Sequence, residues 1–536
     1  MRHPSSPSVP GGVAALAFVA LLAAGAFAGL LAEGAGDLGR AFAGFDAYLL
    51  RVARFTLWQA LLSTLISVGP AILVARALSR HPAFLGRRAV LMLFALPLAL
   101  PALVAALGVL ALFGRAGFVS DVCRWLGGGQ WPGIYGLPGI LVAHAFFNLP
   151  LAARLLLHAL DTIPADQWRL ASQLGMGTAA RWRLIEWPAL RAALPGIAGL
   201  VFMLCLASFT IVLTLGGGPA ATTLEVAIYQ TLRFDFDPAR ALALTMLQLG
   251  LTTIVLAVLL RLGADLTGDA MPSVSAKRYE KPGRLEAGLD AVAIGLAAAL
   301  VAGPVASIVA AGLRADLARL VAEASVRSAV ATSLVLAALS AGLCVALTLS
   351  MVGARHRLAA ARRGTRPGVL ERALDGGASL ILVVPPIVIG AGWFILLRRF
   401  ADVFALAPVM VVTVNAAMAI PFALRAIRPA HDDAATRHDR LCAQLGIHGL
   451  ARWRLIDWPA LRRPLATGFA FAMALSLGDL GVIALFGSDS VQTLPYLLLQ
   501  RMGSYRTADA AGLALILALL CLALMMVAER LGGERR

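Results

Sequence analysis

The chain has 536 residues, of which 60% are hydrophobic and 14% charged, and its mean hydropathy is +0.83. This composition excludes an ordinary soluble domain and predicts a protein that lies mostly in lipid. A net charge of +17 is typical of nucleic-acid binding only when the basic residues share one surface, whereas here they lie between apolar segments. We therefore exclude nucleic acid as a partner.

Apolar windows of about 20 residues, the length that crosses a bilayer, predict an all-α integral membrane protein with about twelve transmembrane helices. The first window is longer than the apolar region of a signal peptide, so we expect a retained helix. With the N-terminus inside, most of the 46 lysine and arginine residues lie on the cytoplasmic side, which places both termini in the cytoplasm. The windows are 11–32, 55–77, 89–113, 137–157, 193–215, 241–261, 288–311, 328–351, 376–397, 406–427, 464–486 and 510–529.

An internal duplication organises the sequence. Residues 169–191 and 440–462 are identical at 16 of 23 positions, at an offset of 271 residues. Six predicted helices separate the copies, and because this number is even, the two halves are parallel repeats. We predict a first half over 1–262 with a loop at about 158–192, a cytoplasmic linker over 263–287, and a second half over 288–536 with a loop at about 428–463.

The repeated loop has the same local pattern in both halves. A short amphipathic helix leads to Gly175 or Gly446, where a helix C-cap favours a left-handed residue. A second short helix follows and is expected to end where Pro188 or Pro459 disfavours helical geometry in the residue before it. The sequence therefore predicts a cytoplasmic helical hairpin, with an interfacial hairpin on anionic lipid as the simpler alternative.

The spacing of glycine, isoleucine and proline in this loop resembles the EAA motif of ABC importer permeases. That resemblance implies docking of the loop into an ATPase subunit, with Gly175 and Gly446 as the motif glycines. The glutamate of the motif is replaced by arginine, so an acidic contact with the ATPase is not assumed. The motif positions are Arg169, Leu170, Ala171, Gly175, Ile185, Pro188, Arg440, Leu441, Cys442, Gly446, Ile456 and Pro459.

The energy source is expected to lie outside this chain. A phosphate-binding loop needs a lysine after glycine, and the only lysines, Lys277 and Lys281, do not follow one. We expect no catalytic residue, metal or cofactor here, with ATP and magnesium held by a separate cytoplasmic ATPase, present as two copies. The other implied partner is a periplasmic binding protein.

Three segments, 143–164, 202–230 and 476–506, resemble fused permeases of thiamine and thiamine-phosphate ABC importers of Gram-negative bacteria. The resemblance covers the whole chain and implies the bacterial inner membrane, import from periplasm to cytoplasm, and alternating access. Fused ferric-iron permeases remain the alternative substrate class. A proton-coupled secondary transporter is the second alternative, although it predicts more mid-helix carboxylates than Asp479 alone.

Asp479 is the clearest charged residue within a predicted membrane helix, where charges are costly and often functional. The repeat aligns it with Ser208, so the two are candidates to face each other across a substrate pathway, with Phe209 as a cation-π partner. The alternatives are a helix-to-helix hydrogen bond for Asp479 and packing for Phe209. His144 and Asn415 are predicted as interhelical hydrogen-bond partners.

Overall fold

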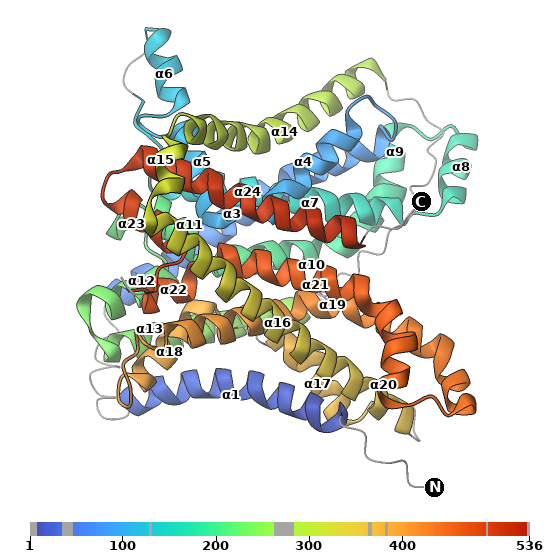
Figure 1. The fold of residues 1–536 in the computed structure, drawn as a ribbon. Coiled ribbons are helices and arrows are strands. Elements are labelled where there is room, and N and C mark those ends of the chain that lie inside the picture. Colours follow the sequence, from blue (N-terminus) through green and yellow to red (C-terminus); the bar gives the residue numbers. More distant parts are fainter. Residues whose placement is uncertain are drawn as a thin grey trace. The chain divides into compact units, whose positions relative to one another are not determined.

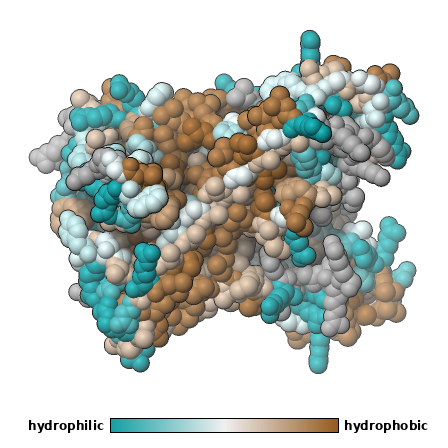
Figure 2. All heavy atoms as spheres, turned by 90° about the horizontal axis from the view of Figure 1, so that it is seen from above, coloured by the Kyte–Doolittle hydropathy of each residue, from teal (hydrophilic) through white to brown (hydrophobic). Residues whose placement is uncertain are grey.

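A computed structural model describes the chain over residues 8–34, 47–127, 131–261, 283–362, 367–380, 384–488 and 491–532, and every element in these ranges is a helix. Eleven helical segments of this part are long and apolar enough to cross a membrane. The shorter apolar helix α18 (Pro386–Leu397) lies where the ninth span was predicted. Apolar side chains cover the middle of the face seen in Figure 2, and hydrophilic ones gather toward its edges. The predicted helical membrane class is confirmed.

Two compact units divide the chain, one made of residues 45–227 and 246–314 and the other of residues 1–44, 228–245 and 315–536. The first contains α3 (Ala47–Arg80), α4 (Arg87–Ala99), α5 (Ala102–Phe113), α6 (Phe118–Trp125), α7 (Leu137–Asp161), α8 (Ala165–Gln173), α9 (Thr178–Arg181), η1 (Trp182–Glu186), α10 (Trp187–Leu206), α11 (Phe209–Leu215), η2 (Pro219–Ala221) and α14 (Arg284–Leu313). We call it the α3–α14 unit.

The other, the α1–α24 unit, contains α1 (Ser8–Gly34), α15 (Leu317–Ala322), α16 (Ala324–Ala361), α17 (Val369–Leu380), α18, α19 (Ala407–Leu445), α20 (Gly449–Arg452), η5 (Trp453–Asp457), α21 (Trp458–Gly478), α22 (Gly481–Phe486), α23 (Leu494–Gly503) and α24 (Thr507–Gly532). It also contains η3 (Thr231–Asp235), whereas α12 (Leu224–Gln230) and α13 (Pro238–Arg261) are divided between the units.

The units differ from the predicted halves at the first helix of each and at residues 228–245. Helix α1 packs on α16 and α18 of the second repeat, as Figure 1 shows. A Cβ atom on Gly392 would lie 2.1 Å from the Ala26 carbonyl oxygen, so the α1 and α18 backbones touch. The Trp393 indole donates to the Leu22 carbonyl at 2.8 Å. Small residues allow such close crossings between membrane helices, where packing rather than a hydrophobic driving force holds helices together.

Helix α14 packs in turn on α3 and α5 of the first repeat. Arg80 at the end of α3 binds Asp290 of α14, with an Nη1 to Oδ1 distance of 3.2 Å, and His81 lies 3.2 Å from the same carboxylate. The first four residues of α14, 284–287, fall in the stretch predicted as linker, while 263–282 lie outside the described residues. Each compact unit thus contains the first helix of the opposite repeat.

The third span of each repeat is broken in the described structure. Leu100 is extended, with φ −91° and ψ 134°, and separates α4 from α5, while Pro385 precedes α18. Proline cannot donate a helical hydrogen bond and disfavours helical geometry in the residue before it. The continuous helix predicted over 89–113 is therefore two helices, α4 and α5.

Candidate functional site

The loop of the first repeat is a compact hairpin. Helix α8 ends in a Schellman motif, in which the Gly175 amide donates to Ser172 and the Met176 amide donates to Ala171, at 3.2 and 3.0 Å. Gly175 has φ +62°, and no atom lies within 4 Å of the position of a Cβ there. The glycine is therefore required by the backbone and not by crowding.

The second repeat keeps the turn but loses the break before it. Gly446 has φ +64°, and the Ile447 amide donates to Cys442 at 2.9 Å. Helix α19, however, runs without interruption from the membrane segment to Leu445, so the predicted separate short helix of this loop is wrong. The cause is local, because Pro164 starts α8 in the first repeat, whereas Ala435 occupies the equivalent position and continues the helix.

The prolines of the motif do not end a helix, which corrects a second prediction. Trp187 and Trp458 are helical, with φ and ψ of −61° and −42° and of −63° and −49°. A five-residue π-helical turn precedes each of them, and the Trp187 amide donates to Trp182, five residues earlier. Such a wider turn accommodates Pro188, which has no N–H to donate to the carbonyl four residues back. The loop therefore continues into α10 or α21 as one helical segment.

The motif positions divide between those that face the unit and those that face outward. Ala171 and Cys442 are buried, and Ile185 and Ile456 are half-buried. Arg169 and Arg440 are exposed at the position of the expected glutamate, and Arg169 forms an ion pair with Asp166 at 3.4 Å.

Exposed leucines recur in both loops; the sequence analysis named Leu170 and Leu441 as motif positions but missed the other four. Six leucines of the two loops are 49% to 67% exposed, and they form three pairs at the repeat offset. A single exposed leucine is normal on a protein surface, but leucine exposed at the same three positions of both repeats makes these side chains candidates for a contact surface. The signal was present in the aligned repeats, where leucine recurs at three fixed places. The pairs are Leu170 with Leu441, Leu174 with Leu445, and Leu184 with Leu455; we call them the loop leucines.

The first loop is fastened to its unit by one arginine of α3. Arg76 binds the buried Glu186 carboxylate with an Nε to Oε2 distance of 2.7 Å. Its guanidinium also lies over the Trp182 ring, 4.0 Å from the centroid. Arg76 therefore ties both ends of η1 to α3 through an ion pair and a cation-π contact.

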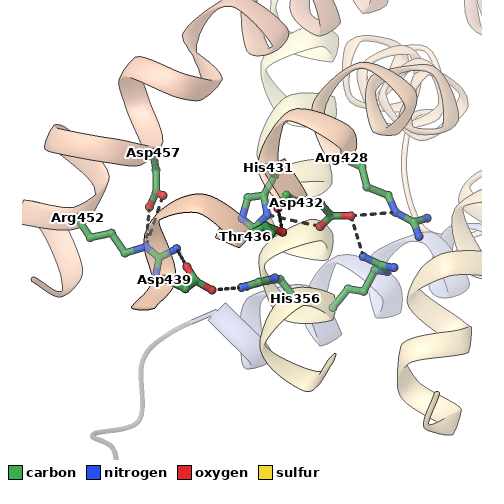
Figure 3. A network of polar contacts seen from close by, with 9 residues as sticks. His356, Arg428, His431, Asp432, Thr436, Asp439, Arg452 and Asp457 are labelled. Carbon is green, nitrogen blue, oxygen red and sulfur yellow. Dashed lines mark hydrogen bonds and ion pairs between the residues drawn. The ribbon is translucent and has the colours of Figure 1, made fainter. Parts of the chain in front are cut away.

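The second loop is fastened by a wider network, drawn in Figure 3. His356 of α16 lies 2.8 Å from Asp439, whose other oxygen accepts from Arg452 at 2.6 Å. Arg452 also binds Asp457 at 3.4 Å. The contacts join the end of α16 to α19 of the loop and, within the loop, α19 to α20 and η5.

One cluster in this network has the residue types of a metal site. The possible ligand atoms of His356, His431 and Asp432 lie within 4.8 Å of one another. Arg355 and Arg428 already bind the Asp432 carboxylate, at 3.2 and 3.8 Å. Two arginines beside the carboxylate of this three-residue cluster oppose a cation, so we assign no metal here.

The candidate pathway residues lie at helix breaks in both units. Ser208 separates α10 from α11, and Asp479 ends α21 two residues before α22 begins, so neither lies within a continuous helix as predicted. Discontinuous membrane helices are typical of transporter binding sites. Asp479 accepts from the Gly481 and Val482 amides at 3.1 and 3.4 Å and stabilises its break. Phe209 is buried.

Equivalent polar chains cross each unit beside these breaks. In the α3–α14 unit, the two ring nitrogens of His144 lie 2.8 Å from the Ser63 and Ser208 hydroxyls. In the α1–α24 unit, the Asn415 side-chain amide donates a hydrogen bond to the Ser476 hydroxyl at 3.0 Å, and the Ser476 hydroxyl donates one to the Ser340 hydroxyl at 3.2 Å. His144 and Asn415 therefore each form hydrogen bonds between helices, as predicted.

Comparisons with known proteins agree with this architecture. Residues 67–268 and 357–533 match the family described as "Binding-protein-dependent transport system inner membrane component". The chain is 59% identical over 536 residues to the "Thiamine transport system permease protein ThiP" of Brucella abortus (strain 2308), covering 100% of this chain and 97% of the relative. Proteins of the same name in Escherichia coli (strain K12) and Haemophilus influenzae (strain ATCC 51907 / DSM 11121 / KW20 / Rd) are 43% and 38% identical, covering 91% and 95% of this chain and 90% and 94% of the relatives.

Proposed function

Because the chain belongs to the family of inner membrane components of binding-protein-dependent transport systems, we propose that it carries thiamine and its phosphates into the cytoplasm. It is a multi-pass transporter subunit of the inner membrane. The observation that carries the choice of substrate is the similarity, over nearly the full length of both chains, to relatives named thiamine transport permeases. The partners we propose are two copies of a cytoplasmic ABC ATPase, which bind ATP and magnesium, and a periplasmic thiamine-binding protein.

The coupling role of the loops is supported by their geometry. The loop leucines offer an apolar surface to an ATPase, and in the first loop Trp182, Arg183 and Trp187 line an open hollow. The helical segment from Thr178 to Leu206 is continuous and ends immediately before the break at Ser208. A push on the loop is therefore transmitted along one rigid segment to the candidate pathway residue.

The corresponding path in the second repeat runs through η5 and α21 to Asp479. We propose alternating access, in which ATP closes the ATPase dimer, the loops move as levers and the breaks at Ser208 and Asp479 change the path open to substrate. A carboxylate at one break suits the cationic thiazolium ring of thiamine. The charge of the substrate and the side chain of Asp479 are then matched at the place where the helix is interrupted.

The test is ATPase activity of the permease, reconstituted in liposomes with its ATPase and binding protein. We expect thiamine-loaded binding protein to stimulate hydrolysis and ferric iron to have no effect. Stimulation by iron alone would keep the coupling role and overturn the substrate. Uptake that continues without any ATPase, but stops when a protonophore is added, would favour the secondary transporter instead.

A further inference from the structure

A groove outside the coupling loops lies in the α3–α14 unit. It is lined by the turn between α3 and α4, by the first two turns of α4, and by Arg154 of α7. The volume of the groove is about 790 Å³. The lining residues that carry the argument are Leu85, Arg87, Arg88, Leu91, Met92 and Arg154.

The charges in this groove are all positive. Arg87, Arg88 and Arg154 line it, and no lining residue is acidic. Within the described residues, no carboxylate forms an ion pair with any of the three, and the buried Nε atom of Arg87 has no hydrogen-bond partner. Neighbouring cations repel one another, and a buried donor without an acceptor is costly. The groove therefore favours an anion that accepts several hydrogen bonds.

The rest of the lining is apolar and open. Leu85 and Met92 are strongly exposed, and Leu91 and Ala95 continue this surface along one face of α4. Exposed apolar residues beside cationic ones fit a ligand with a charged head and a hydrocarbon part. A free phosphate ester would use the arginines and leave the apolar wall uncovered.

The position of the groove along the helices indicates a membrane boundary. α3 ends at Arg80 and α4 begins at Arg87, so the groove lies where the chain leaves and re-enters the apolar layer. α7 carries Arg154 and leads to the coupling loop, so the groove is on the same side as that loop. Basic pockets between helices on the cytoplasmic side are suited to anionic lipid head groups.

We propose that this groove binds an anionic phospholipid of the cytoplasmic leaflet. Arg87, Arg88 and Arg154 hold the phosphate, and Leu85 and Met92 contact the glycerol and the upper acyl chains. The proposal depends on the side of the membrane on which the loops lie and not on which substrate is carried. Arg154 thereby gains the counter-charge that an arginine within an apolar helix needs.

The experiment measures binding of fluorescent phosphatidylglycerol to the purified full chain in neutral detergent, with phosphatidylcholine as the zwitterionic comparison. We expect the wild type to prefer phosphatidylglycerol. The triple variant Arg87→Gln, Arg88→Gln, Arg154→Gln is expected to bind it at least tenfold more weakly. If this variant does not fold, Arg154→Gln and Arg154→Lys provide the same comparison, with the lysine variant retaining most of the affinity.

The matched control is Arg357→Gln with Arg372→Gln, which removes two exposed arginines outside the groove and is expected to leave binding unchanged. Glycerol phosphate serves as the free-anion arm. Displacement of the lipid by glycerol phosphate at equal concentration would overturn the proposal, because the apolar wall would then contribute nothing. Unchanged lipid binding in the triple variant, with weaker association of the ATPase subunit, would also overturn it and assign the groove to that subunit.

Discussion

Truncating one loop leucine in each repeat, by Leu174→Ala and Leu445→Ala, tests whether these side chains hold the ATPase. The two are equivalent by the repeat offset and are 67% and 63% exposed. Because they contact little of their own unit, their truncation is expected to leave the fold intact. Any loss should therefore appear in the affinity for the ATPase subunit.

The size of the effect follows from the exposed fraction. Full burial of a leucine side chain contributes about 1.5 to 3 kcal/mol. If docking buries the exposed two thirds of that surface, and because alanine retains one methyl group, each truncation should reduce the free energy of ATPase binding by about 1 kcal/mol. One such loss weakens ATPase binding at one loop roughly fivefold. In the double variant, the joint binding of two ATPase copies, one at each loop, weakens roughly 30-fold if the two losses add.

The assay is equilibrium binding of the purified ATPase subunit to the detergent-solubilised permease, with the fold checked by thermal unfolding. Leu61→Ala is the control, because Leu61 is 44% exposed but lies within the membrane span of α3. It should leave the affinity for the ATPase unchanged. Wild-type affinity in a folded Leu174→Ala, Leu445→Ala variant would refute docking through the loop leucines.

Three further changes test other parts of the structure. Gly446→Val places a β-branched residue at φ +64° and should raise the conformational free energy of this turn by at least about 1 to 2 kcal/mol, whereas Gly446→Asn should be tolerated. The measurement is ATPase activity stimulated by the binding protein. Asp439→Ala leaves Arg452 without its 2.6 Å partner, and faster amide hydrogen exchange is expected in the second loop but not in the first. Gly392→Ala puts a Cβ 2.1 Å from a backbone oxygen of α1 and should lower the free energy of unfolding by about 1 to 3 kcal/mol, and with it the thermal unfolding midpoint. Gly342→Ala is the control, because a Cβ there meets nothing within 4 Å and should leave the midpoint unchanged.

The elements best predicted from the sequence were those with a strong local signal. Apolar length located the spans, and the glycine turns followed from the need for a left-handed residue at 175 and 446. The predicted end of the second loop helix at Pro188 was wrong, because a π-helical turn accommodates proline without a break, and propensity alone does not reveal such a turn. The break at Asp479 was missed for a similar reason, since its stabilising contacts are to the amides of Gly481 and Val482.

Tertiary partners were the least accessible to sequence analysis. The duplication indicated two parallel halves but not how their helices pack, and the packing of α1 on α18 depends on Gly392 and Ala26, which lie far apart in the chain. Hydropathy marks α1 as a membrane helix without indicating which helices it contacts. The network around Asp439 likewise joins three helices whose contacts no local pattern announces.

The placement of α1 with the second repeat has a consequence for biosynthesis. α1 ends at Gly34, whereas its partner α16 ends at Ala361 and α18 lies further along the chain. At about 5 to 20 residues per second, roughly 15 to 60 s pass between the synthesis of α1 and that of α16. During this time the newly inserted helix is without the neighbours that it has in the finished protein. The α3–α14 unit is complete only when α14, the first helix of the second repeat, has been made, and α1 waits for α16 and α18. Fusing the two repeats in one polypeptide therefore supplies each unit, in equal number, with the helix that it takes from the other repeat.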